Sequence, residues 1–213
     1  MHDVLLSIDT SAGSSVALTR VEGKPGAAEN SSADTMKHAE VIGTLISSCL
    51  EQMSATASEV TAVVAGVGPG PFTGLRVGLA AASAFAVGRN IPLLPVVSHD
   101  AIAFDALEEV AGPIIVVTDA RRRELYWSIY DGWTGQGLPR RIVGPALSKP
   151  DEVPTVHEGT ELTRWDAAEV SAGLLGIIAA RMLAAGIPFE HFAPLYLRSP
   201  DVTMPTAPKR VNS

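Results

Sequence analysis

A glycine-rich segment is the part of the sequence whose residue types and spacing most resemble a ligand-binding loop. It reads GVGPGPFTGLRVG over Gly66–Gly78, between a largely apolar run at 60–65 and an alanine-rich run at 74–87. The first run predicts a strand covered on both faces, and the second predicts a helix. Backbone N–H groups that converge at the start of a helix can hold a phosphate, so the segment lies where a phosphate-binding loop is expected.

The composition of this segment departs from both common phosphate-binding patterns. A P-loop has Lys and then Ser or Thr after its last glycine, whereas Leu75 and Arg76 follow Gly74 here. The glycines lack the spacing of a dinucleotide-binding fold, and Pro69 and Pro71 each lack a backbone donor. We therefore favour a structural strand-to-helix turn over a nucleotide-binding loop.

Two aspartates follow apolar runs that are expected to be strands. Asp9 and Asp119 stand where carboxylates often handle a metal or a phosphate, but also where an aspartate bonds its own backbone in a turn. Both interpretations stay open for Asp9. Asp119 precedes Arg121–Arg123, which favours a local turn or ion pair. This arginine run is the densest basic spot; it is typical of a solvated turn, and contact with RNA phosphate or a partner is the alternative.

The remaining polar residues form no catalytic pattern. The five histidines are scattered, with no two at metal-ligand spacing, and His38 is interpreted as a polar residue at a helix end. G-x-S-x-G, H-E-x-x-H and paired-cysteine motifs do not occur. The single cysteine, Cys49, is expected to be a small buried hydrophobe in a protein of a reducing compartment. The motifs alone do not indicate an enzyme.

The first half of the sequence predicts strands followed by alternating helices and strands. A hairpin is expected from apolar runs at 4–8 and 15–19, a weak strand at best within 22–34, and an amphipathic helix over 35–53. Thr73 and Ser98 are expected to cap the helices at 74–87 and 98–110, with a strand at 93–97 between them. The alanine-rich helix is apolar all round, which predicts burial in a core or against a partner.

The second half repeats the order strand, aspartate, turn, strand. Strands are predicted at 113–118, 124–131 and 138–143, and 145–165 is expected to be irregular. Asp166 and Glu169 resemble a capping box that starts a long helix ending at Gly186. The whole order predicts an α/β fold with a mixed sheet and helices on both faces.

The charge balance argues against nucleic-acid binding by this chain alone. The 213 residues carry a net charge of −7, with 46% hydrophobic and 18% charged residues. Affinity for nucleic acid comes mainly from Lys and Arg, so a partner would provide much of the binding affinity for any RNA substrate. The N-terminus does not resemble a signal peptide and no uncharged run is long enough to span a membrane, so we expect a cytoplasmic protein without a membrane partner.

Several stretches together resemble the TsaB family, the small subunit of the bacterial machinery that makes threonylcarbamoyladenosine in tRNA. They are Ile8-Asp9-Thr10-Ser11, His38, GVGPGPFTGLRVG with its alanine-rich helix, Asp119-Ala120-Arg121, Glu124-Leu125-Tyr126-Trp127 and Pro194-Leu195-Tyr196-Leu197-Arg198. The resemblance covers nearly the whole chain. It departs from the family at Pro71, where Ser is more frequent, at Leu125, where Val is frequent, and in a shortened segment at 145–165.

The resemblance implies a two-lobed fold of the actin/hexokinase/Hsp70 type (ASKHA, ribonuclease H-like) with a reduced second lobe. The first lobe would comprise residues 1–105 and carry the partner-binding helices. The reduced lobe would comprise residues 106–200, and residues 201–213 would form a mobile tail.

The resemblance also implies a non-catalytic subunit that binds and activates TsaD, the enzyme that transfers threonylcarbamoyl to N6 of adenosine 37 (t6A37). The ATPase TsaE would join the assembly. At the positions of TsaD's H-x-x-x-H metal pair stand Ser98 and Ile102, and His99 is one residue out of register. The chain would therefore have no cofactor of its own, with ATP and metal belonging to the partner subunits. tRNA would be bound indirectly through the complex, and a homodimer of the free protein stays open.

Two sets of site residues follow from this family-based hypothesis. The partner-binding set, on the two long helices and the glycine segment, is His38, Val41, Ile42, Leu45, Thr73, Gly74, Arg76, Gly78, Ala82 and Phe85. The residual phosphate cleft is expected at Asp9, Thr10, Ser11, Gly68, Gly70, Asp119 and Arg121. A charge at Gly78 or Ala82 is expected to abolish pairing with TsaD while the monomer stays folded.

Three alternatives compete with this interpretation. The first is an ATP-dependent phosphotransferase or ATPase of the same fold, in which Asp9 would organise a metal and Asp119 would serve the phosphate lobe. The second is an M22-type metallopeptidase, against which the missing H-x-x-x-H argues directly. The third is a self-associating structural protein without an RNA role.

Overall fold

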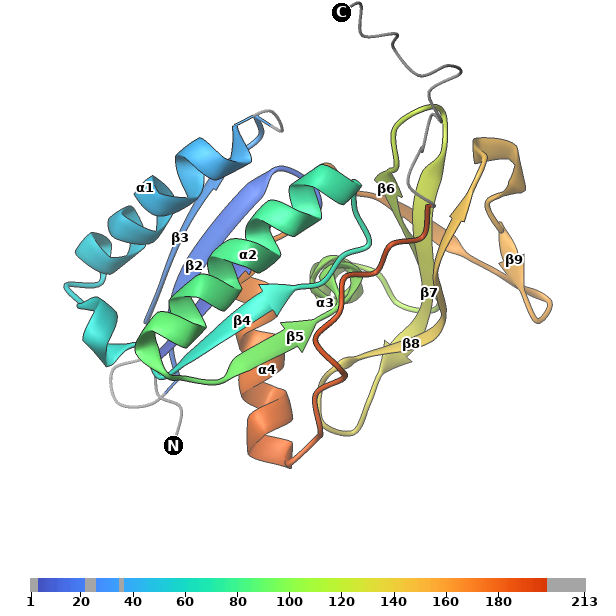
Figure 1. Cartoon of the computed structure of the whole chain (residues 1–213). Helices are drawn as coiled ribbons and strands as arrows, with labels where there is room; N and C mark the ends of the chain where they lie inside the picture. Colours follow the sequence, from blue (N-terminus) through green and yellow to red (C-terminus); the bar gives the residue numbers. More distant parts are fainter. Residues whose placement is uncertain (1–3, 22–25, 35–36, 199–213) are drawn as a thin grey trace, which may run out of the picture.

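The described part of the chain builds a five-stranded and a four-stranded β-sheet joined by helices, and a separate two-stranded sheet (Figure 1). The structure is a computed structural model, and it describes residues 4–21, 26–34 and 37–198. The first sheet has the order β3-β2-β1-β4-β5. Its strands are β1 (Val4–Asp9), β2 (Ser14–Arg20), β3 (Gly26–Ser32), β4 (Ala62–Gly66) and β5 (Leu93–Val96). β1, β2 and β3 are consecutive antiparallel strands, whereas β4 and β5 run parallel to β1.

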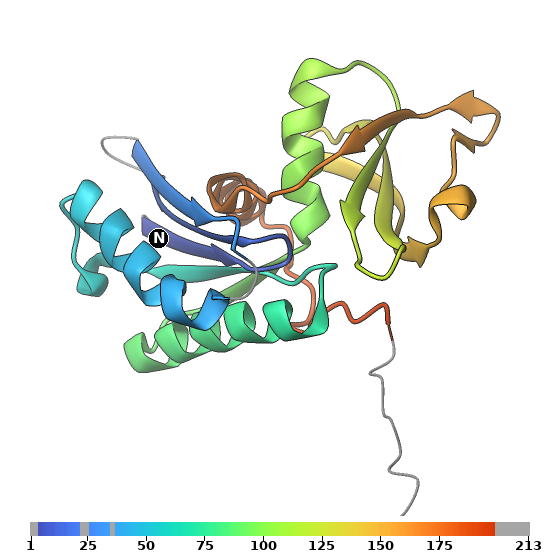
Figure 2. The same cartoon turned by 90° about the horizontal axis from the view of Figure 1, so that it is seen from above.

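Helices cover both faces of the first sheet (Figure 2). On one face lie α1 (His38–Gln52) and α2 (Phe72–Arg89), with the short helix η1 (Ala57–Glu59) between them in sequence. On the other face lies α4 (Ala172–Ala185), against which α3 (Ser98–Glu109) packs. Successive strand residues point to opposite faces, so Leu6 and Val63 pack toward α1 and α2, and Leu5 and Val64 toward α3 and α4.

The second sheet has the order β11-β6-β7-β8. Its strands are β6 (Ile114–Asp119), β7 (Leu125–Trp133), β8 (Pro139–Ser148) and β11 (Thr163–Asp166). One face packs on α3, and the other buries Ile115, Val117 and Ile129 beneath Val153 and Leu162. Val153 and Leu162 belong to the connection between β8 and β11. This connection contains η2 (Pro150–Glu152), β9 (Val156–His157) and β10 (Thr160–Glu161).

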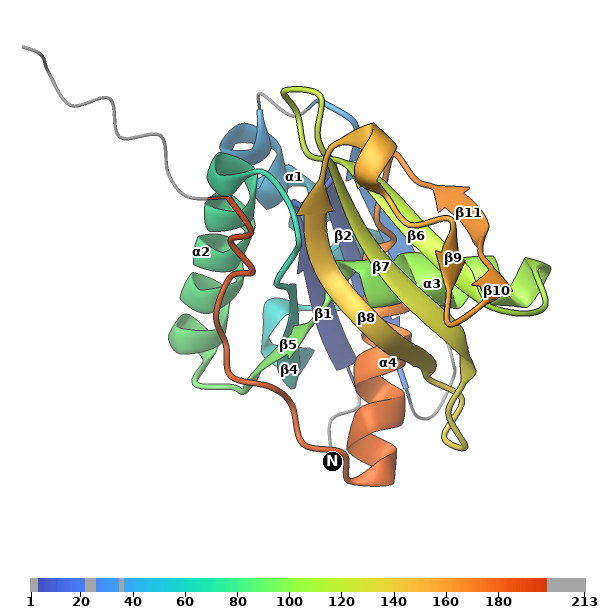
Figure 3. The same cartoon turned by 90° about the vertical axis from the view of Figure 1, so that its right-hand side faces the viewer.

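The segment after α4 returns across the molecule to the start of α2 (Figure 3). Along this path the backbone N–H of Leu195 donates to the carbonyl of Val67 at 2.9 Å. The ring of Tyr196 then packs on that of Phe72, with 4.7 Å between ring centroids. Among the described residues, no helix combines the length and the apolar character needed to cross a membrane.

The predicted order of elements is confirmed, and the differences concern edges and helix starts. Residues 26–32 form a full strand that pairs with β2 along its whole length, and the segment 145–165, expected to be irregular, contains the end of β8 and the first three residues of β11. Thr73 lies inside α2, whose N-cap is Pro71, and Ser98 is the first residue of α3 rather than its cap.

The predicted start of the last helix is also wrong. Asp166 ends β11, and α4 instead begins after Ser171, whose hydroxyl accepts a hydrogen bond from the N–H of Leu174 at 3.1 Å. The predicted lobe boundary at residue 105 falls within α3, and α4 packs on β1 and β2 although it follows the second sheet in sequence. The predicted tail at 201–213 lies outside the described residues.

Candidate functional site in the cleft between two turns

Two turns, each following a strand that ends in aspartate, face a cleft between the sheets. The first turn (residues 9–13) joins β1 to β2, and the second turn (residues 119–124) joins β6 to β7. The cleft, of about 520 Å³, is lined by both turns and by residues of α1, the glycine segment and the start of the segment before α4. Four of the seven predicted cleft residues line it, namely Thr10, Ser11, Asp119 and Arg121.

Asp9 is fully committed to hydrogen bonds within the fold. Its carboxylate is 1% exposed. Oδ1 accepts from the N–H of Ser11 at 2.8 Å and from its hydroxyl at 2.6 Å, and Oδ2 accepts from the hydroxyl of Ser98 at 2.5 Å. Burial raises the pKa of Asp9, and these hydrogen bonds oppose the rise. Of the two interpretations left open, the turn-stabilising one therefore describes Asp9, and its oxygens are not turned toward the cleft as metal ligands.

The glycine segment presses its backbone against the first turn. Four of its glycines stand at intervals of four residues and meet that turn: Gly66, Gly70, Gly74 and Gly78. A Cβ on Gly70 would lie 2.7 Å from Cα of Ser11, and one on Gly74 would lie 2.7 Å from the carbonyl oxygen of Thr10. Real Cβ atoms essentially never make contacts under 3.0 Å, so these positions require glycine.

Hydrogen bonds seal this contact. The hydroxyl of Thr10 donates to the carbonyl of Gly74 at 2.8 Å and accepts from the N–H of Gly78 at 3.1 Å. On the other side of the segment, the N–H of Gly68 donates to the hydroxyl of Ser98 at 3.0 Å. The segment is thus a strand-to-helix turn whose glycines serve close packing, as the sequence favoured.

His38 is the first residue of α1, and its side chain is buried behind the first turn. Its Nδ1 lies 2.7 Å from the hydroxyl of Ser14, and burial lowers the pKa of the imidazole. The side chain is 8% exposed. Its Nε2 lies so close to Gly74 that a Cβ there would approach it to 3.1 Å. His38 therefore stabilises the turn, and its expected position at a helix end is confirmed, since it is the first residue of α1.

The predicted partner-binding set is divided between the surface and the interior. The buried members, besides His38, are Ile42, Gly74, Gly78 and Ala82. Thr73 and Arg76 are exposed, and Val41, Leu45 and Phe85 are half-buried. The buried small residues of α2, Gly74, Gly78 and Ala82, allow close approach of the first turn and the sheet. The expectation that a charge at Gly78 or Ala82 leaves the monomer folded is therefore wrong on steric grounds.

His99 and the residues beside it are structural as well. The imidazole of His99 is fully buried, with Nδ1 2.8 Å from the hydroxyl of Ser128 and Nε2 2.9 Å from that of Thr118. Burial, with a smaller contribution from Arg141, lowers the pKa of His99 to about 3, so the ring is neutral at physiological pH. Ser98 and Ile102 are buried too. Within the described part of the chain, no group of three His, Cys, Asp or Glu residues is arranged to hold a metal ion.

The second turn is open where the first is closed. Asp119 is exposed, and its Oδ1 accepts from the N–H of Arg121 at 2.8 Å, while Oδ2 lies 3.8 Å from Nε of Arg121. This is the local turn and ion pair that the sequence favoured. The three arginines of the turn have φ values of 64°, 55° and 62° at Arg121, Arg122 and Arg123. Such left-handed backbone is unfavourable for residues with a Cβ, and it is found most often at functional sites.

A second cleft, of about 420 Å³, adjoins the first and was not predicted from the sequence. We call it the arginine cleft; its charged and aromatic lining is Phe72, Arg121, Arg122, Tyr126, Tyr196 and Arg198. Tyr126 is anchored there, because its hydroxyl donates to the carbonyl of Gly70 at 3.2 Å. Arg198 forms an ion pair with Glu124 at the start of β7. The sequence motif at 194–198 was noticed only as part of a resemblance, since nothing local to it places it beside the second turn.

The sequence resembles proteins of tRNA modification. The family model described as "TsaD: tRNA N6-adenosine threonylcarbamoyltransferase" matches residues 32–191. An uncharacterized protein of Mycobacterium leprae is 38% identical over 84% of this chain, and the chain spans about half of that relative, 50%. An uncharacterized protein of Mycobacterium tuberculosis is 37% identical over 81% of each chain. The tRNA threonylcarbamoyladenosine biosynthesis protein TsaB of Escherichia coli is 27% identical over 76% of this chain and 81% of its own.

The fold is that of a solved relative. The structure of YeaZ from Pseudomonas aeruginosa matches with a TM-score of 0.77 and 25% identity, over 92% of this chain and 100% of YeaZ. This match confirms the predicted actin/hexokinase/Hsp70-like fold. With the family model covering most of the chain, it also establishes the family: the chain belongs to the TsaD family of threonylcarbamoyltransferase-related proteins, among its TsaB (YeaZ) members.

Proposed function

We propose that this chain is the non-catalytic subunit of the bacterial t6A37 synthesis complex, where it binds and activates TsaD together with TsaE. The names of its relatives support the pathway, since the E. coli relative is a threonylcarbamoyladenosine biosynthesis protein and the family model is named for the transferase. In this role ATP and metal belong to the partner subunits, tRNA is reached through the complex, and the protein works in the cytoplasm without a membrane partner.

The observation that carries the proposal is the outer side of α2. Its exposed residues include Ala80, Ala84 and Val87, which we call the outer stripe; they are spaced three or four residues apart on one side of the helix. Val87 is 78% exposed. No charged residue occurs between Arg76 and Arg89. The inner side of the same helix is buried on the sheet, so α2 is apolar on both sides, as expected for a helix between a core and a partner.

The hydrogen bonds inside the cleft support a role without catalysis. The two positions that correspond to the family's metal pair are Ser98 and Ile102, and the hydroxyl of Ser98 is already shared between Asp9 and Gly68. Asp9, which a phosphotransferase of this fold would need, is held by Ser11 and Ser98. Asp9 and Ser98 are thus used to fix the first turn, which supports a role for the chain through the surface of α2.

The test is reconstitution of threonylcarbamoyl transfer to tRNA. Purified TsaD and TsaE are supplied with threonylcarbamoyl-adenylate and an ANN-decoding tRNA, with and without this chain, and modified adenosine is quantified by mass spectrometry. We expect transfer to require this chain. Equal transfer in its absence contradicts the proposal.

The outer stripe gives the interface a direct test. Val87→Asp is expected to weaken binding to TsaD at least ~10-fold, because an aspartate would be desolvated at the centre of an apolar contact. Since Val87 is exposed in the chain itself, the variant should unfold at the wild-type temperature. Val156→Asp is the matched control: that valine on β9 is 54% exposed and lies outside the stripe, so TsaD binding should not change.

The same variants separate TsaD binding from self-association. If the stripe instead pairs two copies of this chain, light scattering will show a wild-type dimer that Val87→Asp converts to a monomer, while TsaD binding stays unchanged. Normal TsaD binding by Val87→Asp and Ala84→Asp would exclude the outer stripe as the TsaD interface.

A further inference from the structure

We infer that the arginine cleft binds a nucleotide unit, with its phosphate on Arg121 and Arg122 and its base against Phe72 and Tyr196. This gives the chain a ligand of its own, which the proposed function does not, and it does not depend on any contact with TsaD. The chemistry is that of a nucleoside phosphate. It is shared by a free mononucleotide and by one nucleotide of an RNA strand, and the experiment below distinguishes these two sources.

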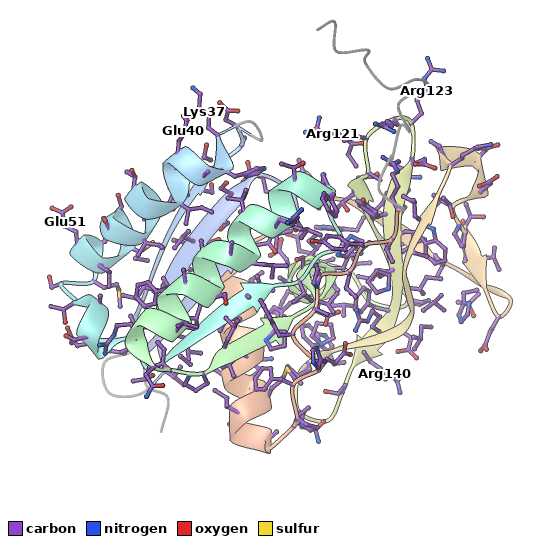
Figure 4. The ribbon with its side chains drawn as sticks, viewed as in Figure 1. Lys37, Glu40, Glu51, Arg121, Arg123 and Arg140 are labelled. Carbon is purple, nitrogen blue, oxygen red and sulfur yellow. The ribbon has the colours of Figure 1, made fainter. Side chains whose placement is uncertain are left out.

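The charge of the cleft is the first observation. Three guanidinium groups line it, from Arg121, Arg122 and Arg198, and no acidic residue occurs among the described residues of its lining; Asp119 and Glu124, which pair with Arg121 and Arg198, lie outside that lining. This concentration stands out in a chain whose net charge is −7. Figure 4 shows Arg121 and Arg123 at the β6–β7 turn, on the side of the molecule where α2 begins, and Glu51 far from it on α1. A concave site lined by one sign of charge concentrates ligands of the opposite sign.

The start of α2 adds a second source of positive potential at the same place. The first N–H groups of a helix have no acceptor within the helix and attract anions. In α2 these groups belong to Phe72 and Thr73, and both residues line the arginine cleft. The helix therefore points its positive end at the space that the guanidinium groups surround. Planar guanidinium groups can donate two parallel hydrogen bonds to a phosphate.

The aromatic rings indicate a base rather than a bare anion. Phe72 and Tyr196 are 41% and 40% exposed, and they are two of the six large hydrophobic side chains that stand out as exposed in the described chain. They lie together, with ring centroids 4.7 Å apart, and the guanidinium of Arg76 lies 5.1 Å from the centroid of Phe72. Aromatic surface of this kind beside arginines is what single nucleotides stack on in proteins that bind them without base-pair reading.

The cleft is also held in one shape from several sides. Tyr126 is tied to the glycine segment through the carbonyl of Gly70, and Arg198 to Glu124. The backbone N–H of Leu195 donates to Val67, which fixes Tyr196 beside α2. A site whose lining comes from the glycine segment, the second turn and the C-terminal segment at once is preformed, and its volume of about 420 Å³ lies in the range of small-molecule pockets.

The experiment measures binding by the full-length chain to three probes. They are inorganic phosphate, AMP, and a 17-nucleotide RNA hairpin, each titrated by calorimetry at low and moderate salt. We expect AMP to bind more tightly than phosphate, because only AMP reaches the aromatic pair. Binding of AMP marks a free-nucleotide site, whereas binding of the hairpin alone marks an RNA contact. The inference is overturned if neither AMP nor the hairpin binds.

Two neighbouring arginines provide a matched pair of variants. Arg122 lines the cleft and Arg123 does not, although both occupy the same turn with similar positive φ. Arg122→Gln is expected to lower the affinity for the probe that binds by at least ~10-fold, and Arg123→Gln by less than ~2-fold. Equal effects of the two variants would overturn the assignment to the cleft. Tyr196→Leu should lower the affinity for AMP but not the affinity for phosphate. The unfolding temperature of each variant shows whether it is folded.

The inference and the proposed function fail in different ways. If threonylcarbamoyl transfer proceeds without this chain but AMP or the hairpin binds with the pattern above, the proposed function falls and the cleft assignment stands. If transfer requires this chain but no probe binds, the proposed function stands and the cleft assignment falls.

Discussion

The first and second turns share one local pattern and have opposite surroundings. Each follows a buried strand that ends in aspartate and leads into an antiparallel partner strand. Asp9 in the first turn is 1% exposed and bonded by two serine hydroxyls. Asp119 in the second turn is exposed and bonds the backbone of its own turn and the side chain of Arg121.

The difference comes from what packs against each turn. The glycine segment covers the first turn so closely that its carboxylate and hydroxyls find all their partners inside the protein. Among the described residues, the second turn is contacted by Arg198, while Arg121 and Arg122 of the turn line the clefts. The same sequence pattern thus serves stability in one place and brings charged side chains to the lining of the clefts in the other. A ligand of the cleft would therefore meet the chain through the second turn.

The largest effect is expected where the comparison is most direct, at the contact between α2 and the first turn. In Gly78→Ala the new Cβ would overlap the hydroxyl of Thr10, and its distance falls below the 3.0 Å that real Cβ atoms respect. Overpacking of this kind costs ~1–3 kcal/mol, occasionally more, and the loss of the Thr10 hydrogen bond places this variant at about 3 kcal/mol or above. Urea unfolding followed by circular dichroism measures it.

Gly88→Ala is the control on the same helix. A Cβ on Gly88 meets nothing within 4 Å, and the residue is exposed. Replacing a helical glycine by alanine at such a site stabilises by ~0.4–1 kcal/mol. If Gly78→Ala is as stable as Gly88→Ala, the first turn is not sealed by α2 and the contrast between the two turns is lost.

The sequence predicted the fold where periodicity and turn residues act locally. The hairpin β1–β2, helices α1 and α2 and the end of α4 at Gly186 are all where the pattern put them, because apolar spacing and a left-handed glycine determine them. β3 and β11 were missed or undervalued because each is an edge strand of few apolar residues, stabilised by its neighbour. The predicted helix starts were wrong for different reasons: the hydroxyl of Ser98 bonds Asp9, Thr73 lies two residues past the cap of α2, and Asp166 ends β11 before Ser171 caps α4.

The candidate site shows a sharper limit. Thr10, Ser11, Asp119 and Arg121 line the cleft and were named from the sequence, because each follows or ends a strand-like run at a turn. The sequence did not predict which side of α2 faces outward, because a helix that is apolar all round has no periodic pattern that would orient it. Tyr196 and Arg198 were beyond reach because only the return path of the C-terminal segment brings them to the second turn.

A second, smaller effect on stability is expected at His99, which contacts both strands of the β6–β7 hairpin. His99 lies between Thr118 of β6 and Ser128 of β7, and its pKa is lowered from 6.5 to about 3 by burial. The unfolded chain therefore binds a proton at this residue between those pH values and the folded chain does not. Stability contributed by the neutral ring is present above pH ~6.5 and lost as pH falls, by roughly 2 kcal/mol between pH 7.5 and pH 5.

His99→Gln isolates this contribution. The variant keeps a donor and an acceptor but cannot titrate. Between pH 7.5 and pH 5 its unfolding free energy should therefore fall by ~2 kcal/mol less than that of the wild type. The buried carboxyls Asp9 and Asp100 have raised pKa values and act in the opposite direction, but they are common to both proteins and cancel in the difference. Parallel pH profiles would show that His99 is not buried as a neutral ring.

The smallest effect is expected at Asp119, and it completes the comparison with Asp9. Asp119→Asn keeps an oxygen for the N–H of Arg121 and removes only an exposed ion pair, so the unfolding free energy should change by no more than ~0.5 kcal/mol. Asp9→Asn replaces a buried acceptor of two serine hydroxyls by a group that must donate, and a cost of ~1–3 kcal/mol is expected. Urea unfolding of the two variants side by side decides the matter: if the same Asp→Asn change costs equally at both strand ends, burial by the glycine segment is not what distinguishes the two turns.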